Sequence, residues 1–436
     1  MMMIPKVDRY CLKNARIPSC LLEGIEIASE TKEGLCLVNL EIIAGKISKI
    51  SAGDRSDPNL ETIDLNKKIV FPCFVDMHTH LDKGHIWQRS PNPDGTFNSA
   101  LNSVKNDCQN WQFEDVYRRM EFGIKCSYSR GTKAIRTHID CFGELADISL
   151  KAFENLKQER ADKITLQAVS LVTLDYFQSD RGVALADKIK EIDGILGGVV
   201  YMHPELESQL DNIFSLAIER GLDLDFHVDE NGDRDSICLR KVAEAAIRHK
   251  FQGKIVCGHC CSLAVQDLET VNITLEAVKQ ANIGVVSLPS CNLYLQDREL
   301  GKTPFWRGVT RVHELKKQGI PVAFASDNCR DPFYAFGDHD VLEVFTQAVR
   351  IGHLDMPYGN WCASVTKIAA ELIGLSQMGR IAPGLPADLI IFKARYFSEL
   401  LSRSQDDRIV LRLGKSIDTS LPDYAELDDL VVTEID

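Results

Sequence analysis

The chain has 436 residues, of which 44% are hydrophobic and 26% charged, and a formal net charge of −13. A chain of this length and composition is predicted to be a soluble globular protein with a large core and more than one domain. The acidic balance excludes nucleic acid as the main partner, because neutralising phosphates requires a basic face. No apolar run approaches the roughly 18 residues needed to span a membrane.

The fourteen cysteines are scattered along the chain, and the start, MMMIPKVDRY, lacks the apolar core of a signal peptide. We therefore expect a cytoplasmic protein with free, mostly buried thiols rather than a disulfide scaffold. The stretch CGHCC at 257–261 has no second paired-cysteine motif at the right spacing. A structural zinc is not expected there.

The two ends of the chain share a β-rich texture. Residues 36–51 (CLVNLEIIAGKISKIS) and 62–72 (TIDLNKKIVFP) are short runs broken by Gly, Asp and Lys, a pattern typical of an antiparallel sheet. A similar texture returns at 379–392 (GRIAPGLPADLIIF) and 407–418 (DRIVLRLGKSID). The two ends are predicted to form one small β domain, split in sequence and joined in space.

The middle of the chain alternates strand-like and helix-like segments. Eight near-continuous apolar runs are predicted to be parallel strands buried on both faces. They are VFPCFVDMHTH (70–80), KAIRTHID (133–140), ITLQAVSLV (164–172), GILGGVVYM (194–202), LDLDFHVDE (222–230), KIVCGHC (254–260), IGVVSLPS (283–290) and PVAFASD (321–327). Segments between them, such as SQLDNIFSLAIERG (208–221), carry apolar residues at helical spacing. Eight βα units over roughly 300 residues imply a (β/α)8 TIM barrel.

Polar residues interrupt these apolar runs at their carboxyl ends. They are His78 and His80 in the first run, His138 and Asp140 in the second, His227, Asp229 and Glu230 in the fifth, His259 in the sixth and Asp327 in the eighth. The carboxyl ends of the strands in such a barrel surround the active site, so these side chains are expected to converge on one mouth. Burying them unpaired would be costly, which favours a shared ligand over isolated core residues.

His78 and His80 are predicted to bind a metal. They are two residues apart, and on a strand such residues point to the same face, so both imidazoles enter the barrel. His227 and Asp327 are expected to supply further ligands. Three nitrogens and one carboxylate oxygen suit one zinc or iron(II) ion and suit calcium or magnesium poorly. A single buried histidine is usually a hydrogen-bonded core residue, so the role of His138 stays open.

In these motifs the chain resembles the amidohydrolase superfamily, and within it the cytosine deaminase branch. HTH in the first strand, HVDE in the fifth, GH in the sixth and SD in the eighth follow the superfamily pattern in order. The branch is indicated by HLD (80–82), RTHID (136–140), CNLYLQDR (291–298) and DPFYAFG (331–337). The resemblance covers nearly the whole chain. It implies a metal-dependent catalytic barrel over 73–377 and a β-sandwich domain made of 1–72 and 378–436.

The resemblance also implies roles for individual residues. Those that would hold one divalent metal are His78, His80, His227 and Asp327. The fourth strand ends VVYMHP, without the lysine that bridges two metals in some members, so one ion per chain is expected. Glu230 would move a proton between a ring nitrogen, the nucleophile and the leaving amine. His259 would orient the attacking water, and Asp327 would accept the proton that the water gives up. Ammonia would leave once the amine is protonated.

The positions that would contact substrate depart from cytosine deaminases. Known members carry a glutamine after the third strand, where this chain has Thr173 or Leu174. Asn328 stands where a second aspartate often follows the strand-eight aspartate, and Phe333 stands where a tryptophan is usual. Gln296, after the seventh strand, is predicted to reach in and replace the missing amide. These five residues are the candidate substrate-binding residues.

The leading hypothesis is metal-dependent hydrolytic deamination of cytosine, or of a closely related aminated N-heterocycle, as in pyrimidine metabolism. The run SDNCRDPF (326–333) is more similar to N-isopropylammelide isopropyl amidohydrolases. Removal of an alkylamine from a triazine-like ring is therefore the enzymatic alternative. A non-catalytic scaffold is the third hypothesis, and the presence of all four ligands and Glu230 argues against it. The expected partner is a small heterocycle, with no nucleic acid and no membrane, and homo-oligomerisation stays open.

Overall fold

Eight strands form a closed barrel in the computed structural model, which describes residues 7–25, 31–52 and 60–431. The strands are β6 (Phe74–Thr79), β7 (Thr132–Asp140), β8 (Thr165–Leu171), β9 (Leu196–Val200), β10 (Leu224–Val228), β11 (Ile255–His259), β12 (Gly284–Ser287) and β13 (Val322–Phe324). β6, β7 and β8 pair in that order, and β9 to β13 form a second, parallel sheet. Parallel bridges join the two sheets at both edges, Val169 to Ile195 and Thr79 to Asp327. The predicted barrel is confirmed.

All eight barrel strands differ in extent from the predicted runs, and two of these differences have a clear cause. The first run is broken at Cys73, because β5 (Val70–Pro72) pairs antiparallel with β14 (Leu389–Ile391) before the chain enters β6. The seventh run ends early, because Pro289 begins helix α8. Proline has no N–H to give to a strand and is well tolerated in the first turn of a helix.

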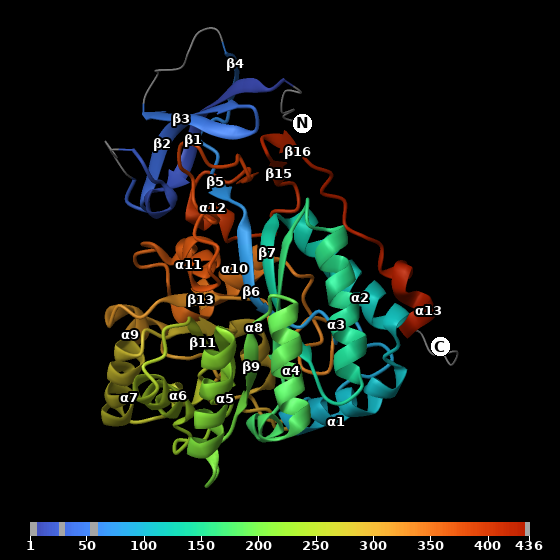
Figure 1. The fold of residues 1–436 in the computed structure, drawn as a ribbon. Coiled ribbons are helices and arrows are strands. Elements are labelled where there is room, and N and C mark those ends of the chain that lie inside the picture. The colour runs from blue at the N-terminus through green and yellow to red at the C-terminus, as the bar shows by residue number, and fades with distance from the viewer. Residues whose placement is uncertain (1–6, 26–30, 53–59, 432–436) are drawn as a thin grey trace. The chain divides into compact units, whose positions relative to one another are not determined.

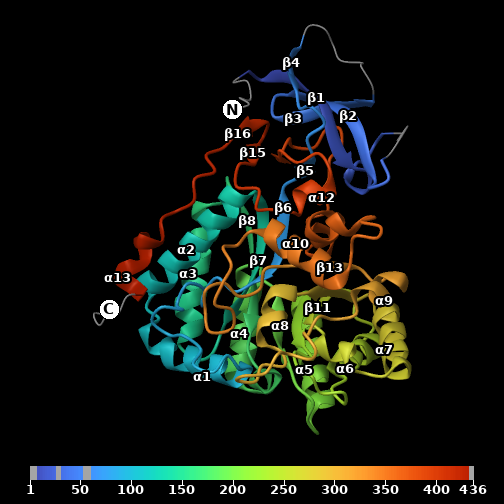
Figure 2. The ribbon, with the colours of Figure 1, turned by 180° about the vertical axis from the view of Figure 1, so that it is seen from behind.

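Helices follow the barrel strands along the chain. They are α1 (Phe97–Asp107), α2 (Phe113–Arg130), α3 (Leu145–Glu159), α4 (Asp180–Glu191), α5 (Leu206–Arg220), α6 (Cys238–Arg248), α7 (Leu268–Gln280), α8 (Pro289–Leu295), α9 (Val312–Lys317) and α10 (Val341–Gly352). Helices α3 to α7 lie outside the strands (Figure 1), and Figure 2 shows the same arrangement from behind. In α5 the residues Leu210, Ile213 and Ala217 are fully buried at helical spacing, and Gly221 ends the helix at φ 63°. Glycine takes this left-handed conformation without steric cost.

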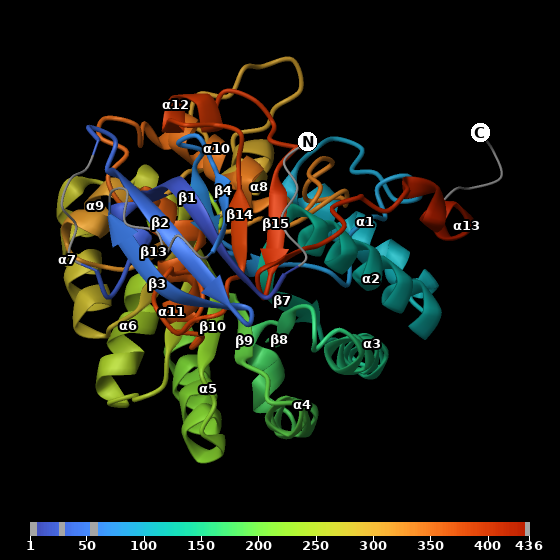
Figure 3. The same cartoon turned by 90° about the horizontal axis from the view of Figure 1, so that it is seen from above.

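Two four-stranded sheets form a β-sandwich from both ends of the chain, as predicted. The first has the order β3-β2-β1-β4 and the second β16-β15-β14-β5. Their remaining strands are β1 (Arg9–Pro18), β2 (Leu35–Ile43), β3 (Lys46–Ala52), β4 (Glu61–Asp64), β15 (Ile409–Arg412) and β16 (Lys415–Ser416). Leu40 of β2, Val70 of β5 and Leu389 of β14 are fully buried in one shared core. β1, β2 and β3 lie side by side in Figure 3, while β4 pairs parallel with β1 rather than antiparallel as expected.

The described residues divide into two compact units. The first comprises the described parts of 1–75, 127–133 and 341–421, and the second those of 76–126, 134–340 and 422–436. Helices α10, α11 (Lys367–Leu372) and α12 (Phe397–Leu400) fall in the first unit, and α13 (Asp428–Val431) falls in the second. The domain boundaries at 72 and 378 remain a prediction. Within the described ranges, no helix combines the length and apolarity that crossing a membrane demands.

Candidate active site

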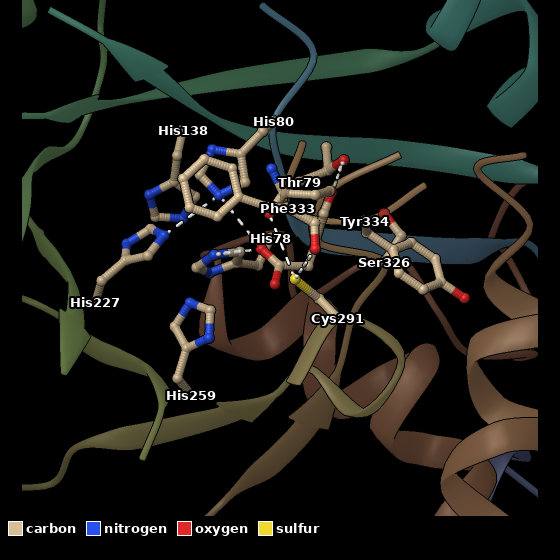
Figure 4. Close-up of polar contacts among 12 residues, drawn as sticks. His78, Thr79, His80, His138, His227, His259, Cys291, Ser326, Phe333 and Tyr334 are labelled. Atoms are coloured by element: carbon tan, nitrogen blue, oxygen red, sulfur yellow. Dashed lines mark hydrogen bonds and ion pairs between the residues drawn. The ribbon is translucent and has the colours of Figure 1, made fainter. Parts of the chain in front are cut away.

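Four histidines and one aspartate converge at the carboxyl ends of β6, β10, β11 and β13. Figure 4 shows His78, His80, His227 and His259 directed toward one another. The Nε2 atoms of His78 and His80 lie 3.5 and 3.3 Å from Oδ1 of Asp327. The Nε2 atoms of His80 and His227 are 3.3 Å apart. A nitrogen of His259 also lies within 4.8 Å of donor atoms of His78, His227 and Asp327. The structure brings all four predicted ligands together and adds His259 to the group.

Closure of the barrel is what brings Asp327 to the histidines. The backbone N–H of Asp327 donates to the carbonyl of His78 at 2.9 Å, and the Thr79 hydroxyl donates to the carbonyl of Asp327 at 2.8 Å. One residue earlier, Ser326 donates its N–H and its hydroxyl to the buried Asp76 carboxylate at 3.0 and 2.5 Å. The first and last strands are thus bonded to each other at the site itself.

The backbone around the cluster adopts conformations that side chains rarely take. Asp229, His259 and Asp327 have φ angles of 52°, 69° and 63°. Such left-handed residues cost free energy and occur most often where function requires them. Gly258 has a different reason for being glycine: a Cβ there would lie 2.9 Å from Cε1 of His78. The GH motif therefore makes room for the His78 ring and turns the chain at His259.

Burial sets the protonation of the cluster. Burial, reinforced by neighbouring imidazoles, holds the pKa of His78 and His227 well below the usual range, so both rings are neutral. Burial would raise the pKa of Asp327, but His259 and His80 outweigh it and lower that pKa. Asp327 is therefore an ionised carboxylate. Neutral imidazoles and a carboxylate are the forms in which these residues bind metals.

These residues fit a divalent metal ion. Neither ring nitrogen of His78 and neither oxygen of Asp327 makes a well-formed hydrogen bond within the described part of the chain. Buried polar atoms without partners are costly, and one cation would satisfy them together. Ligand atoms about 2.0–2.1 Å from a tetrahedral zinc lie roughly 3.3–3.4 Å from one another. The separations of 3.3, 3.3 and 3.5 Å between cluster atoms match that spacing.

Glu230 lies beside the cluster in a triangle with two other side chains. Its Oε1 is 3.2 Å from Nδ1 of His259 and accepts a hydrogen bond of 3.2 Å from the amide of Asn292. The same amide lies 3.0 Å from Nδ1 of His259. Burial would lower the pKa of His259, but Glu230 and Asp327 outweigh it and raise that pKa. Asn292, on α8, was missed in the sequence, although it lies within the motif CNLYLQDR.

Asp229, between the ligand His227 and Glu230, has a structural task. Its carboxylate accepts hydrogen bonds from the Ser236 hydroxyl at 2.6 Å and from the backbone N–H groups of Cys238 and Leu239 at 2.9 Å each. These are the first N–H groups of α6, which have no partner within the helix. Asp229 thereby ties the segment that carries Glu230 to the start of α6.

A cavity of about 580 Å³ opens beside the cluster. His80, His227, His259 and Glu230 all contribute to its wall. The apolar part of the wall includes Phe97, Leu101, Val104, Phe142, Leu145 and Leu171. The volume lies within the roughly 300–1,000 Å³ typical of small-molecule sites. Glu230, which would move protons, and two of the residues that would hold the metal, His80 and His227, thus face the same cavity.

The predicted substrate contacts divide into two sets. Thr173, Asn328 and Phe333 line the cavity. Leu174 does not, because its side chain is turned into the core, with 2% of its surface exposed. Asn328 is held in place by its amide, which donates to Asp331 at 2.7 Å.

Gln296 is also absent from the cavity wall, contrary to the prediction that it reaches in. Its amide donates to the backbone carbonyl of Glu230 at 3.2 Å, which turns the side chain away from the cavity. The polar pair that does line the wall, Lys83 and Asp140, was not predicted to contact substrate. Lys83 lies three residues after His80, in the stretch HLDKGH, and this closeness to a predicted metal ligand was the signal in the sequence that could have identified it.

His138 lies behind the cluster rather than on the cavity. Its ring centroid is 3.9 Å from that of His78, and its Nε2 is 3.7 Å from Oδ1 of Asp225. Asp225 in turn accepts a hydrogen bond of 2.8 Å from Arg136. His138 therefore packs against His78, one of the predicted metal ligands, and does not face the cavity.

The fold and the site define a barrel of the kind found in enzymes, with a His/Asp cluster beside a cavity at the carboxyl ends of its strands. The chain belongs to the amidohydrolase family, whose sequence pattern matches residues 121–412. This is a family of hydrolases that act on C–N bonds, as the resemblance implied.

Individual relatives support this assignment. The chain is 47% identical to a pterin deaminase of Rhizobium rhizogenes, over 98% of both chains. Its fold matches the crystal structure of a 5-methylcytosine deaminase of Klebsiella pneumoniae liganded with 5-fluorocytosine, with a TM-score of 0.80 and 26% identity over 93% of this chain and 97% of that one. It also matches an N-isopropylammelide isopropylaminohydrolase of Burkholderia multivorans, with a TM-score of 0.75 and 19% identity over 95% and 100% of the two chains. The last likeness is one of fold.

Proposed function

We propose that this protein is a metal-dependent deaminase that releases ammonia from a pterin, a fused bicyclic ring with a 2-amino and a 4-oxo group. The proposal is carried by one observation: Glu230, His259 and the cluster residues His80 and His227 all line a single cavity. The choice of ring is supported by the 47% identity to a pterin deaminase. It narrows the expectation drawn from the sequence, which was cytosine or a related aminated N-heterocycle.

The size of the cavity favours a bicyclic ring over a single pyrimidine. A cavity of about 150 Å³ suffices for a benzene-sized ring. The cavity beside the cluster is about 580 Å³ and has a largely apolar wall. It therefore has room for two fused rings and a substituent, whereas cytosine would leave most of the apolar wall without contact.

The residues divide the reaction among themselves. A zinc or iron(II) ion held by His78, His80, His227 and Asp327 would supply Lewis-acid activation of water at neutral pH. Glu230 protonates a ring nitrogen next to the attacked carbon as the water oxygen bonds to that carbon. Asp327 takes the proton that the water gives up.

His259 and Glu230 orient the attacking oxygen and release the amine. Nε2 of His259 has no hydrogen-bond partner among the described residues and is free to orient the attacking oxygen. The ionised Glu230 then takes the proton of the new carbon-bound hydroxyl and delivers it to the exocyclic amine, the C–N bond breaks, and ammonia leaves. The proton held by Asp327 returns to Glu230 for the next turnover. The ring carbon becomes a carbonyl.

An ammonia-release screen tests the proposal. The metal-loaded protein is offered pterin, cytosine, 5-methylcytosine, isocytosine, isoguanine, creatinine and N-isopropylammelide. We expect kcat/KM for pterin to exceed that for cytosine by at least about 10²-fold, because the second ring buries additional apolar surface against the cavity wall. Release of isopropylamine from N-isopropylammelide at a higher kcat/KM than ammonia from pterin would favour the alternative hydrolase. A fully metal-loaded protein that acts on none of these rings would sink the proposal.

Asn292 is predicted to position Glu230 and His259. Changing Asn292 to Ala removes the amide that lies within 3.2 Å of both groups. We expect kcat for pterin to fall by about 10-fold with the metal retained, the scale reported for groups that orient an active site without reacting. Asn102→Ala, at an exposed position of α1, is the matched control and should leave kcat unchanged. Equal kcat values in the two variants would show that Glu230 needs no such support.

A further inference from the structure

The cavity wall carries a buried ion pair that the proposed chemistry does not use. Nζ of Lys83 lies 2.7 Å from Oδ1 of Asp140, and their side chains are 5% and 12% exposed. Asp82 holds both residues by their backbones, since its carboxylate accepts from the N–H of Lys83 at 2.9 Å and from the N–H of Asp140 at 2.7 Å. The ammonium and the carboxylate are therefore fixed side by side at the wall.

The pair offers two different hydrogen-bonding functions to a ligand. An ammonium has three N–H donors and no acceptor, whereas a carboxylate only accepts. Lys83 uses one donor on Asp140, and the ring centroid of Phe333 lies 5.8 Å from its Nζ. Burial would lower the pKa of Lys83, but Asp140 and Asp82 outweigh it and raise that pKa. The ammonium stays charged inside the cavity and keeps donors for a ligand.

We propose that Lys83 and Asp140 bind the lactam edge of the substrate ring and so determine which aminated heterocycles are accepted. Lys83 donates to the ring carbonyl oxygen, and Asp140 accepts from the neighbouring ring N–H. This inference rests on the proposed function. It assigns to Lys83 and Asp140 the ring-binding task that the sequence had given to Gln296, which lies off the wall.

The chemistry of the pair predicts which rings are rejected. A pterin presents a carbonyl and an adjacent N–H next to the carbon that bears the amine. In 2,4-diaminopteridine an amino group replaces the carbonyl, and the adjacent ring nitrogen has no hydrogen. Its donors and acceptors are therefore reversed, so the ammonium would meet an amino group and the carboxylate a lone pair. A site built to hydrogen-bond one pattern rejects the other strongly, because its buried polar groups are left unpaired.

The test compares the two rings in each protein. For the wild type we expect kcat/KM for pterin to exceed that for 2,4-diaminopteridine by at least about 10²-fold. In Lys83→Met/Asp140→Asn the ratio should fall to within about 10-fold. The double variant is preferred because Lys83→Met alone would leave buried carboxylates without a compensating charge and endanger folding. Asp140→Asn alone is the second variant and should also lower the ratio.

Lys151→Met is the matched control. Lys151 is exposed on α3 and does not line the cavity, so its substitution should leave the ratio at the wild-type value. Thermal unfolding and metal content establish that each variant is folded and loaded.

A binding measurement separates this inference from the proposed function. The fluorescent dioxo product, lumazine, keeps the lactam edge, and its Kd is measured by titration against that of 2,4-diaminopteridine. If the wild type releases no ammonia from either ring, the proposed function fails, while a preference for lumazine that the double variant loses would still support the pair. An unchanged ratio of Kd values or of kcat/KM values in a folded, metal-loaded double variant overturns the assignment.

Discussion

Replacing His227 with Ala is expected to remove most of the bound metal and nearly all deaminase activity. The wild type should hold about one zinc or iron ion per chain, because one cluster of facing donors is predicted to bind it. His227 Nε2 lies 3.3 Å from His80 Nε2, so the substitution removes one of the atoms predicted to coordinate the metal. Losing a ligand outright costs more than the roughly 10–100-fold effects of the groups that orient ligands. The measurement is metal content by atomic emission together with kcat for pterin.

His203→Ala is the matched control for this substitution. His203 is half-buried, and its ring is 3.0 Å from Gln209, outside the cavity wall. It should keep both metal and activity. Two equivalents of metal in the wild type, an active preparation without metal, or a His227→Ala protein that retains its metal would each contradict the proposed site.

Glu230→Gln is expected to lower kcat by at least about 10²-fold, the usual scale of general acid–base catalysis. Glutamine has nearly the same shape and can still contact the Asn292 amide, 3.2 Å from the present carboxylate. It can neither give nor take the proton that deamination requires. The metal should stay bound, since Glu230 is not among the predicted ligands. Steady-state kinetics on metal-replete protein decides the point.

Glu207→Gln provides the comparison for Glu230→Gln. Glu207 lies on α5 and pairs with Lys241 at 2.7 Å, with 64% of its side chain exposed. Its substitution should leave kcat within experimental error. Near-normal turnover by metal-replete Glu230→Gln would show that another group moves the proton, whatever the outcome for His227.

The barrel and the sandwich could be predicted from the sequence because both depend on local patterns. Continuous apolar runs mark strands covered on both faces, and helical spacing marks the segments between them. The strand at 70–80 also carries the two-residue spacing that puts His78 and His80 on one face. Since all strands of such a barrel end at the same rim, His227 and Asp327 could be expected at the same place. The structure brings these four residues together there.

The surroundings of the cluster depended on tertiary structure. Lys83 and Asp140 are 57 residues apart, and Asn292 and Glu230 are 62 residues apart, so no local pattern pairs them. Gln296 was predicted to face the cavity from its position after the seventh strand. Its amide instead donates to the Glu230 carbonyl, a contact that the sequence pattern does not reveal. These side chains lie at the end of β7, on loops and at the short helix α8, where periodicity does not set their direction. The sequence by itself determined which residue types stand at the strand ends, whereas packing between loops from different strands decided which of them face the cavity and which partner each one meets.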